Sequence, residues 1–248
     1  MGLEFSEEAS PALPAASAIV IRQTHEGLET LLLKRSDELK HMPGLWVFPG
    51  GKVEVCDEGD DDLEQARCGA ARELQEEAGL SLPAEMLLTF SHWLTPVVVK
   101  RRFSTWFFIA EVGSDEPVTV DGSEIVAHDW WRPGDAILAH HEGQLPITPP
   151  TLVSLHDLQV EDNPAVLLAQ LGERAPPRFF PRVVRDGDQM AFLYEGDAAY
   201  ESGDLTQQGA QHRTLGARGI FRYICLLYTS DAADDSLRVD LGGRRIIK

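Results

Sequence analysis

Residues 64–80 read Glu64-Gln-Ala-Arg-Cys-Gly-Ala-Ala-Arg72-Glu73-Leu-Gln-Glu76-Glu77-Ala-Gly79-Leu80. Apolar residues recur every three or four positions through this stretch, which predicts an amphipathic helix. The apolar stripe consists of Leu63, Ala66, Ala70, Leu74 and Ala78. Acidic residues 60–62 suit the positive N-terminal end of such a helix, and Gly79 suits its C-terminal cap.

The helix carries three carboxylates where an isolated helix would be destabilised by them. At about 100° per residue, Glu73, Glu76 and Glu77 share one arc of its surface. Like charges three and four residues apart repel each other, and these lie near the negative C-terminal end of the helix. A solvent-exposed acidic face is the simpler interpretation. A divalent cation with oxygen ligands is the alternative that would stabilise the cluster.

The stretch also resembles the Nudix box. Phe48-Pro49-Gly50-Gly51 precedes it, and Glu64, Arg72-Glu73, Glu76-Glu77 and Gly79 follow in the order and spacing of that motif. The family pattern has five residues between its first glycine and its first glutamate, whereas Lys52–Leu63 separate Gly51 from Glu64 here. We therefore expect a seven-residue insertion before Glu64, in an acidic loop over residues 54–62.

The resemblance implies a metal-dependent hydrolase of nucleoside diphosphates linked to another group. In such an enzyme Glu73, Glu76 and Glu77 would bind Mg²⁺ or Mn²⁺, and the Gly51 carbonyl would add a ligand. Arg72 would orient a glutamate through an ion pair, with Glu64 as the expected partner. The family varies in which carboxylate is the general base, and none is assigned. The catalytic set is thus Glu64, Arg72, Glu73, Glu76 and Glu77.

A second resemblance concerns the substrate. Leu31-Leu-Leu-Lys-Arg35-Ser36, Lys40, Gly44 and Phe48-Pro-Gly-Gly51 are similar to the signature of Nudix enzymes that cleave coenzyme A, with Leu33 in place of Thr and Lys40 in place of Arg. Coenzyme A carries a 3′-phosphate beside its pyrophosphate and requires additional cations. The residues expected to bind substrate are Arg35, Lys40, Gly50, Gly51, Arg101 and Arg102.

Three functions remain open at this point. The first is a diphosphatase for coenzyme A or acyl-coenzyme A, and the second is a diphosphatase for ADP-ribose or a sugar nucleotide. The third is a Nudix module that senses a nucleotide without hydrolysing it. Arg35 and Lys40 are as readily interpreted as ordinary charges at a strand end and in a loop.

The order of strands and helices predicts an α/β protein, and the resemblance implies a Nudix-type α/β/α sandwich with a mixed sheet. We expect a loose arm at 1–16, the Nudix domain at 17–172 and a small β appendage at 176–224 that packs on the domain or forms a homodimer contact. Residues 225–248 begin Cys-Leu-Leu-Tyr-Thr-Ser-Asp-Ala-Ala-Asp-Asp and resemble a translated sequencing adapter, so we expect a non-native tail.

The net charge of −18 over 248 residues argues against binding to nucleic acid or to an anionic membrane. No apolar run approaches the ~20 residues that span a bilayer. The three cysteines lack metal-ligand spacing and are too few for a disulfide framework. The expected partner is therefore a small nucleotide substrate, and the expected location is the cytoplasm.

Overall fold

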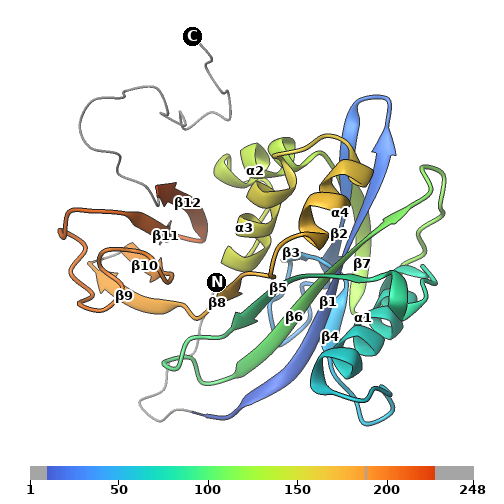
Figure 1. Ribbon diagram of the computed structural model, residues 1–248, viewed down its shortest axis with the longest axis horizontal. Helices are drawn as coiled ribbons and strands as arrows, with labels where there is room; N and C mark the ends of the chain where they lie inside the picture. Colours follow the sequence, from blue (N-terminus) through green and yellow to red (C-terminus); the bar gives the residue numbers. More distant parts are fainter. Residues whose placement is uncertain (1–9, 188, 227–248) are drawn as a thin grey trace.

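Two β-sheets and four α-helices make up the computed structural model, which describes residues 10–187 and 189–226 (Figure 1). The larger sheet contains β1 Ala12–Thr24, β2 Gly27–Arg35, β3 Trp46–Val47, β4 Gly50–Lys52, β5 Leu88–Leu94, β6 Arg102–Val112, β7 Ile125–Trp131 and β8 Arg178–Phe179. The helices are α1 Asp62–Ala78, α2 Pro133–His141, α3 Pro149–Leu158 and α4 Pro164–Gly172, with a short 3₁₀ turn at Ala84–Met86. The smaller sheet contains β9 Arg182–Asp186, β10 Gln189–Leu193, β11 Gln211–Ala217 and β12 Ile220–Leu226.

The long strand β1 organises the larger sheet. It pairs parallel with β6, antiparallel with β2 and antiparallel with β4, so the sheet is mixed as expected. Successive side chains of a strand point to opposite faces. Ile19 and Ile21 accordingly join the core beneath α2, α3 and α4, whereas Ala18 and Val20 join the core beneath α1. Helices therefore cover both faces, which confirms the α/β/α sandwich.

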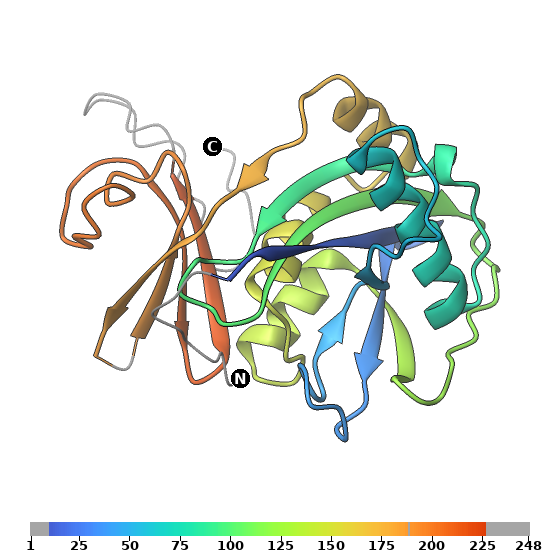
Figure 2. The same ribbon diagram turned by 90° about the horizontal axis from the view of Figure 1, so that it is seen from below.

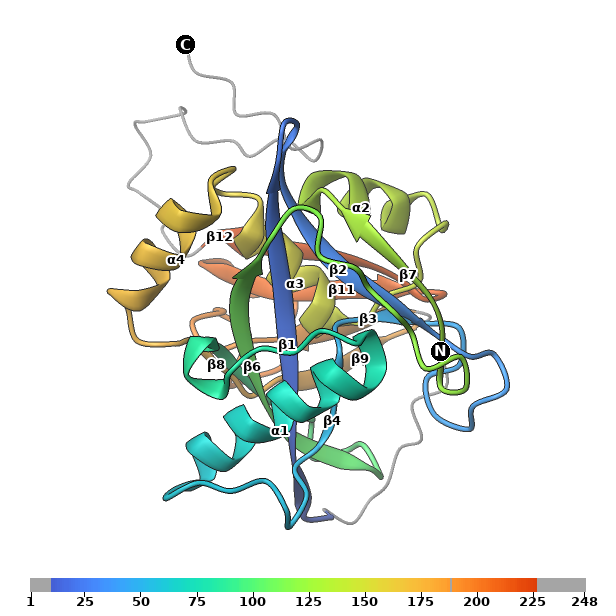
Figure 3. The same ribbon diagram turned by 90° about the vertical axis from the view of Figure 1, so that its right-hand side faces the viewer.

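The helix that carries the acidic cluster lies against β1 (Figure 3). Asp61 caps its N-terminus, since the carboxylate accepts hydrogen bonds from the Leu63 and Glu64 backbone N–H groups. Gly79 ends it at a φ of 70°, a left-handed conformation that glycine adopts without strain. Ala66, Ala70, Leu74 and Ala78 are buried under the helix, so the predicted stripe is confirmed except that Leu63 is only partly buried.

The smaller sheet packs beside the sandwich and shares its core (Figure 2). Phe192, Tyr194 and Phe221 belong to the same buried cluster as residues of α2 and α3. His140 on α2 fixes the contact, since its Nε2 accepts a hydrogen bond from the Phe221 backbone N–H at 2.8 Å. The small β appendage is thus present and is held against the helices.

Two boundaries and one additional strand differ from the sequence-based expectations. Strand β1 begins at Ala12, inside the predicted arm, because pairing with β6 continues to Ala12↔Arg102. Strand β11 was not predicted. Strand β12 continues through Leu226, two residues into the predicted non-native tail, and the rest of that tail, 227–248, lies outside the described residues. Within the described ranges, no helix has both the length and the apolar character needed to cross a bilayer.

Candidate functional site

The glycine pair of β4 brings the main chain against both β1 and α1. A Cβ atom at Gly50 would lie 2.5 Å from the Ala16 carbonyl oxygen and 2.8 Å from the Ser17 Cα. A Cβ atom at Gly51 would overlap the carboxylate of Glu73. Gly50 therefore requires glycine, because a larger residue would push β4 away from the backbone of β1, whereas a larger residue at Gly51 would displace either β4 or the Glu73 carboxylate.

Glu77 occupies a buried position at this junction. Glu77 is only 7% exposed, and its Oε2 accepts a hydrogen bond from the Gly50 backbone N–H at 2.8 Å. Burial raises the pKa of Glu77 to about 7, with Glu73 adding to the effect and the Gly50 N–H opposing it. No ion pair reaches Glu77 from the residues described. The charge of Arg35 lowers that pKa only in part, so the ionised carboxylate is costly without a directly bound positive partner.

Arg72 holds the other two carboxylates of the cluster. One guanidinium nitrogen, Nη1, donates to Glu73 Oε1 and to Glu76 Oε2, each at 3.0 Å. The Glu73 side chain is 15% exposed, whereas that of Glu76 is 57% exposed. Burial raises the pKa of Glu73 even though Arg72 opposes the effect. The three predicted ligands thus face one junction but differ greatly in their access to solvent.

The predicted ion pair between Arg72 and Glu64 is not formed, and Asp57 takes the place of Glu64. Arg72 Nε donates to Asp57 Oδ1 at 2.9 Å and Nη2 donates to Asp57 Oδ2 at 3.1 Å. The Glu64 carboxylate instead accepts a hydrogen bond from the Asp60 backbone N–H at 3.0 Å. Two turns of helix separate Glu64 from Arg72, which is too far for a direct pair.

Sequence spacing contained the signal for Asp57. Five residues, 52–56, separate Gly51 from Asp57, the same interval that the family pattern has before its first glutamate. If Asp57 is the first acidic residue of the motif, the extra residues lie after it, between Asp57 and Arg72, and not between Gly51 and that first acidic residue. Asp57 is buried, which alone would raise its pKa. Hydrogen bonds from Arg72 and from the Glu54 backbone N–H outweigh burial and lower that pKa.

The donor set fits a hard divalent cation, although its side chains are not arranged around one. No three His, Cys, Asp or Glu side chains in the described part of the chain are grouped closely enough to hold an ion. Arg72 engages Glu73 and Glu76, and Gly50 engages Glu77. Carboxylate and carbonyl oxygens suit Mg²⁺ or Mn²⁺, and Glu77 is a buried carboxylate with no ion-pair partner among described residues.

A large cavity opens beside the carboxylates, with a volume of about 1420 Å³. Glu73, Glu76 and Glu77 line it, as do five of the six residues expected to bind substrate: Arg35, Lys40, Gly50, Gly51 and Arg101. The Arg35 side chain is 17% exposed and lies 3.9 Å from Glu124, a separation that makes a weak ion pair. Its Nε has no hydrogen-bond partner among the described residues. Arg35 is therefore available to an anion in the cavity.

Arg102 does not line this cavity and has a structural role. It is 9% exposed, and its guanidinium donates to the Thr95 and Ser10 carbonyl oxygens at 3.1 and 2.8 Å. Arg101 lies just before β6 and lines the cavity, whereas Arg102 is the first residue of that strand. The prediction that both arginines bind substrate therefore finds support only for Arg101.

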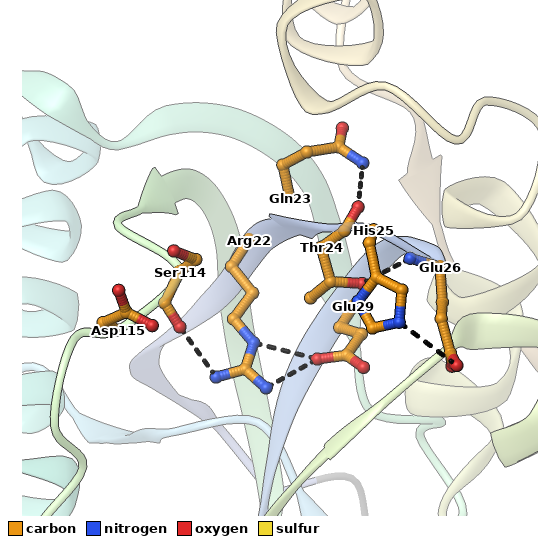
Figure 4. A pocket seen from close by; sticks show the side chains of 8 residues that line it. All are labelled: Arg22, Gln23, Thr24, His25, Glu26, Glu29, Ser114 and Asp115. Carbon is orange, nitrogen blue, oxygen red and sulfur yellow. Dashed lines mark hydrogen bonds and ion pairs between the residues drawn. The ribbon is translucent and has the colours of Figure 1, made fainter.

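Sequence reasoning missed the second sheet as part of the cavity. Pro181, Phe192, Tyr194, Arg218, Gly219 and Ile220 all contribute to its lining. Another hollow, at the turn between β1 and β2, has a different character (Figure 4). There Arg22 is bound by Glu29 and by the Ser114 carbonyl, so its charge is already satisfied.

Comparisons with known proteins point to one family. The family model described as "NUDIX domain" matches residues 11–150. "Putative nudix hydrolase 7" of Caenorhabditis elegans is 27% identical over 184 residues, which are 60% of this chain and 61% of that protein. "Acyl-coenzyme A diphosphatase NUDT19" of Xenopus laevis is 26% identical over 219 residues, which are 79% of this chain and 54% of that protein.

The alignments thus span about half to three fifths of these relatives' lengths. Among solved structures, a NUDIX hydrolase from Alicyclobacillus acidocaldarius has a TM-score of 0.58 at 23% identity, covering 64% of this chain and 96% of that one. At that identity the likeness concerns the fold alone.

Proposed function

The chain belongs to the Nudix hydrolase family, and we propose that it hydrolyses the pyrophosphate bond of coenzyme A or acyl-coenzyme A with Mg²⁺ or Mn²⁺. Water would attack one phosphorus, and the bond from that phosphorus to the bridging oxygen would break. The products would be 3′-phosphoadenosine 5′-phosphate and phosphopantetheine, or acyl-phosphopantetheine. The observation that carries the proposal is one cavity lined by the acidic cluster of α1 together with Arg35, Lys40 and Arg101.

Each charged group has a distinct task in this proposal. Glu73, Glu76, Glu77 and the Gly51 carbonyl would hold the metal ion. When bound, the ion would neutralise phosphate charge and activate water. Arg72 keeps Glu73 and Glu76 in position, and the Gly50 N–H keeps Glu77 in position. Asp57 in turn fixes the guanidinium of Arg72 through two hydrogen bonds.

The cations of the cavity would bind the phosphate groups that lie away from the metal. Arg35 and Arg101 can present a planar fork to a phosphate, whereas Lys40 presents a point charge. Three cations are more than a pyrophosphate coordinated by metal requires, and they suit a substrate with an additional phosphate. Curated relatives named acyl-coenzyme A diphosphatase support this substrate class.

A substrate panel tests the proposal. Coenzyme A, octanoyl-coenzyme A and ADP-ribose would each be incubated with the protein and Mg²⁺ or Mn²⁺, and the products identified by mass spectrometry. We expect 3′-phosphoadenosine 5′-phosphate from both coenzyme A substrates and none with Glu77→Gln. Intact coenzyme A alongside cleaved ADP-ribose would favour the ADP-ribose reading. Tight nucleotide binding without turnover, unaffected by Glu77→Gln, would favour the sensing module.

A further inference from the structure

The active-site cavity extends beyond the Nudix sandwich to the second sheet. The α1 carboxylates line it, and so do residues of β10 and of the turn between β11 and β12. Helix α1 and the second sheet lie on opposite sides of the molecule (Figure 2). The second sheet is therefore positioned to touch whatever part of the substrate projects away from the pyrophosphate.

A fixed contact holds this far wall in place. His140 Nδ1 donates to the Leu145 carbonyl oxygen at 2.9 Å, while its Nε2 accepts from the Phe221 N–H at 2.8 Å. The ring of Phe221 stacks on the ring of His140 at 5.9 Å between centroids. Ile220 directly precedes Phe221, so its backbone position is determined by the same contact.

The wall itself is apolar. Ile220 is a large apolar side chain that remains 36% exposed, and it faces the α2–α3 connection near Gly143. Phe192 and Leu145 line the same cavity from the second sheet and from that connection. Among the described residues of the second sheet that line the cavity, only Arg218 carries a formal charge. An exposed isoleucine in the wall of a cavity offers apolar surface to a ligand.

The cavity is also large. Pockets for drug-sized ligands occupy roughly 300–1,000 Å³, whereas this cavity measures about 1420 Å³. Apart from Arg218, the acidic and cationic residues that line the cavity come from the sandwich and its loops, and the other second-sheet residues in the lining are uncharged. A substrate that is charged at one end and apolar at the other matches this division.

We propose that the second sheet forms an acyl-binding subsite, with Ile220 as a residue that determines the preference for acyl-coenzyme A over free coenzyme A. This inference rests on the proposed function and specifies which part of the substrate the second sheet contacts. The acyl chain loses contact with water when it lies against the exposed side chain of Ile220, beside the nearly buried Phe192 and Leu145 of the same lining. The gain grows with each methylene that is buried.

The test compares kcat/KM for free, acetyl-, butyryl-, hexanoyl- and octanoyl-coenzyme A. For the native chain we expect kcat/KM to rise with chain length. In Ile220→Asn we expect the ratio of octanoyl- to free coenzyme A to fall about tenfold, the lower end of what one lost apolar contact contributes to discrimination. Leu138→Asn is the matched control, because Leu138 is 57% exposed on α2 and lies outside the cavity lining. It should leave the ratio as it is.

The outcomes separate the two proposals. Cleavage of free coenzyme A with no dependence on chain length in the native chain would overturn the acyl subsite and leave the proposed function standing. An unchanged ratio in folded Ile220→Asn would overturn the role of Ile220. Failure to cleave any of the coenzyme A substrates would overturn the proposed function, and the subsite with it. The chain-length series on the native protein needs no variant to fold.

Discussion

The backbone N–H of Gly50 donates a hydrogen bond to Glu77 Oε2 at 2.8 Å, which joins strand β4 to the most buried carboxylate of the cluster. The bond restrains a side chain on α1 from a strand that lies far away in sequence. It also explains how a carboxylate only 7% exposed is tolerated in the fold. The stability of this junction should therefore depend on the protonation of Glu77.

The first prediction concerns the metal-free protein. Burial raises the pKa of Glu77 from 4.5 to about 7. A carboxyl with a raised pKa stabilises the fold fully below pH 4.5, and this contribution is lost as pH rises through about 7. At pH 8 the free energy of unfolding of Glu77→Gln should therefore exceed that of the native chain by about 3 kcal/mol. At pH 5 the difference should be much smaller. Urea titrations in EDTA at both pH values measure this.

Glu85→Gln provides the control for this comparison, since Glu85 is exposed and lies just beyond α1. It should have the same stability as the native chain at both pH values. Mn²⁺ should raise the melting temperature of the native chain and of Glu85→Gln more than that of Glu77→Gln, because a bound ion stabilises the folded state. Equal stabilisation of all three by Mn²⁺ would contradict the role of Glu77 as a ligand.

The second prediction separates Asp57 from Glu64. Asp57→Asn weakens both hydrogen bonds that orient Arg72, so Glu73 and Glu76 lose their positioning. We expect kcat to fall by about 10- to 100-fold, the usual effect of losing an outer-shell partner at a metal site. Glu64→Gln should reduce kcat by less than about threefold, because among the described residues the Glu64 carboxylate binds only the Asp60 N–H. A larger loss of kcat with Glu64→Gln than with Asp57→Asn would support Glu64, and not Asp57, as the acidic residue that positions Arg72.

The third prediction concerns the space at Gly51. A methyl group there would overlap the Glu73 carboxylate and displace either β4 or the metal-binding side chain. Gly51→Ala should therefore lose at least about 100-fold in kcat/KM, a cost in line with misplacing a reacting group by an ångström. Gly172→Ala is the control, since nothing lies within 4 Å of a Cβ at that position. Gly172→Ala should keep full activity. Comparable activity in Gly51→Ala would contradict the close approach of Gly51 to the Glu73 carboxylate.

Local sequence was sufficient for the helix and its cluster but not for the partner of Arg72. The apolar stripe and Gly79 predict α1 because helical periodicity and capping are local properties. The Arg72–Asp57 pair depends on a loop that folds back onto the helix. The interval from Gly51 to Asp57 is compatible with this pair, but spacing along the chain does not by itself decide between Asp57 and Glu64. Ile220 belongs to the cavity because of tertiary packing through His140, which no periodicity encodes.

The last prediction concerns the attachment of the second sheet. His140 donates from Nδ1 to a carbonyl and accepts at Nε2 from an N–H, so the neutral tautomer is required. Burial lowers the pKa of His140, and it lowers those of the neighbouring His141 and His156, the last to about 4. A histidine with a lowered pKa contributes stability fully above about pH 6.5, and this contribution is lost as pH falls toward its folded value. Each such histidine adds a slope of about 1.4 kcal/mol per pH unit in that window.

The melting temperature of the native chain should accordingly fall between pH 7 and pH 5, and the fall should be shallower in His140→Gln. Glutamine keeps an acceptor for the Phe221 N–H but does not titrate. His25→Gln is the matched control, because the His25 side chain is 90% exposed and lies at the turn between β1 and β2. If His140→Gln and His25→Gln follow the native curve equally, protonation of His140 does not govern the attachment of the second sheet.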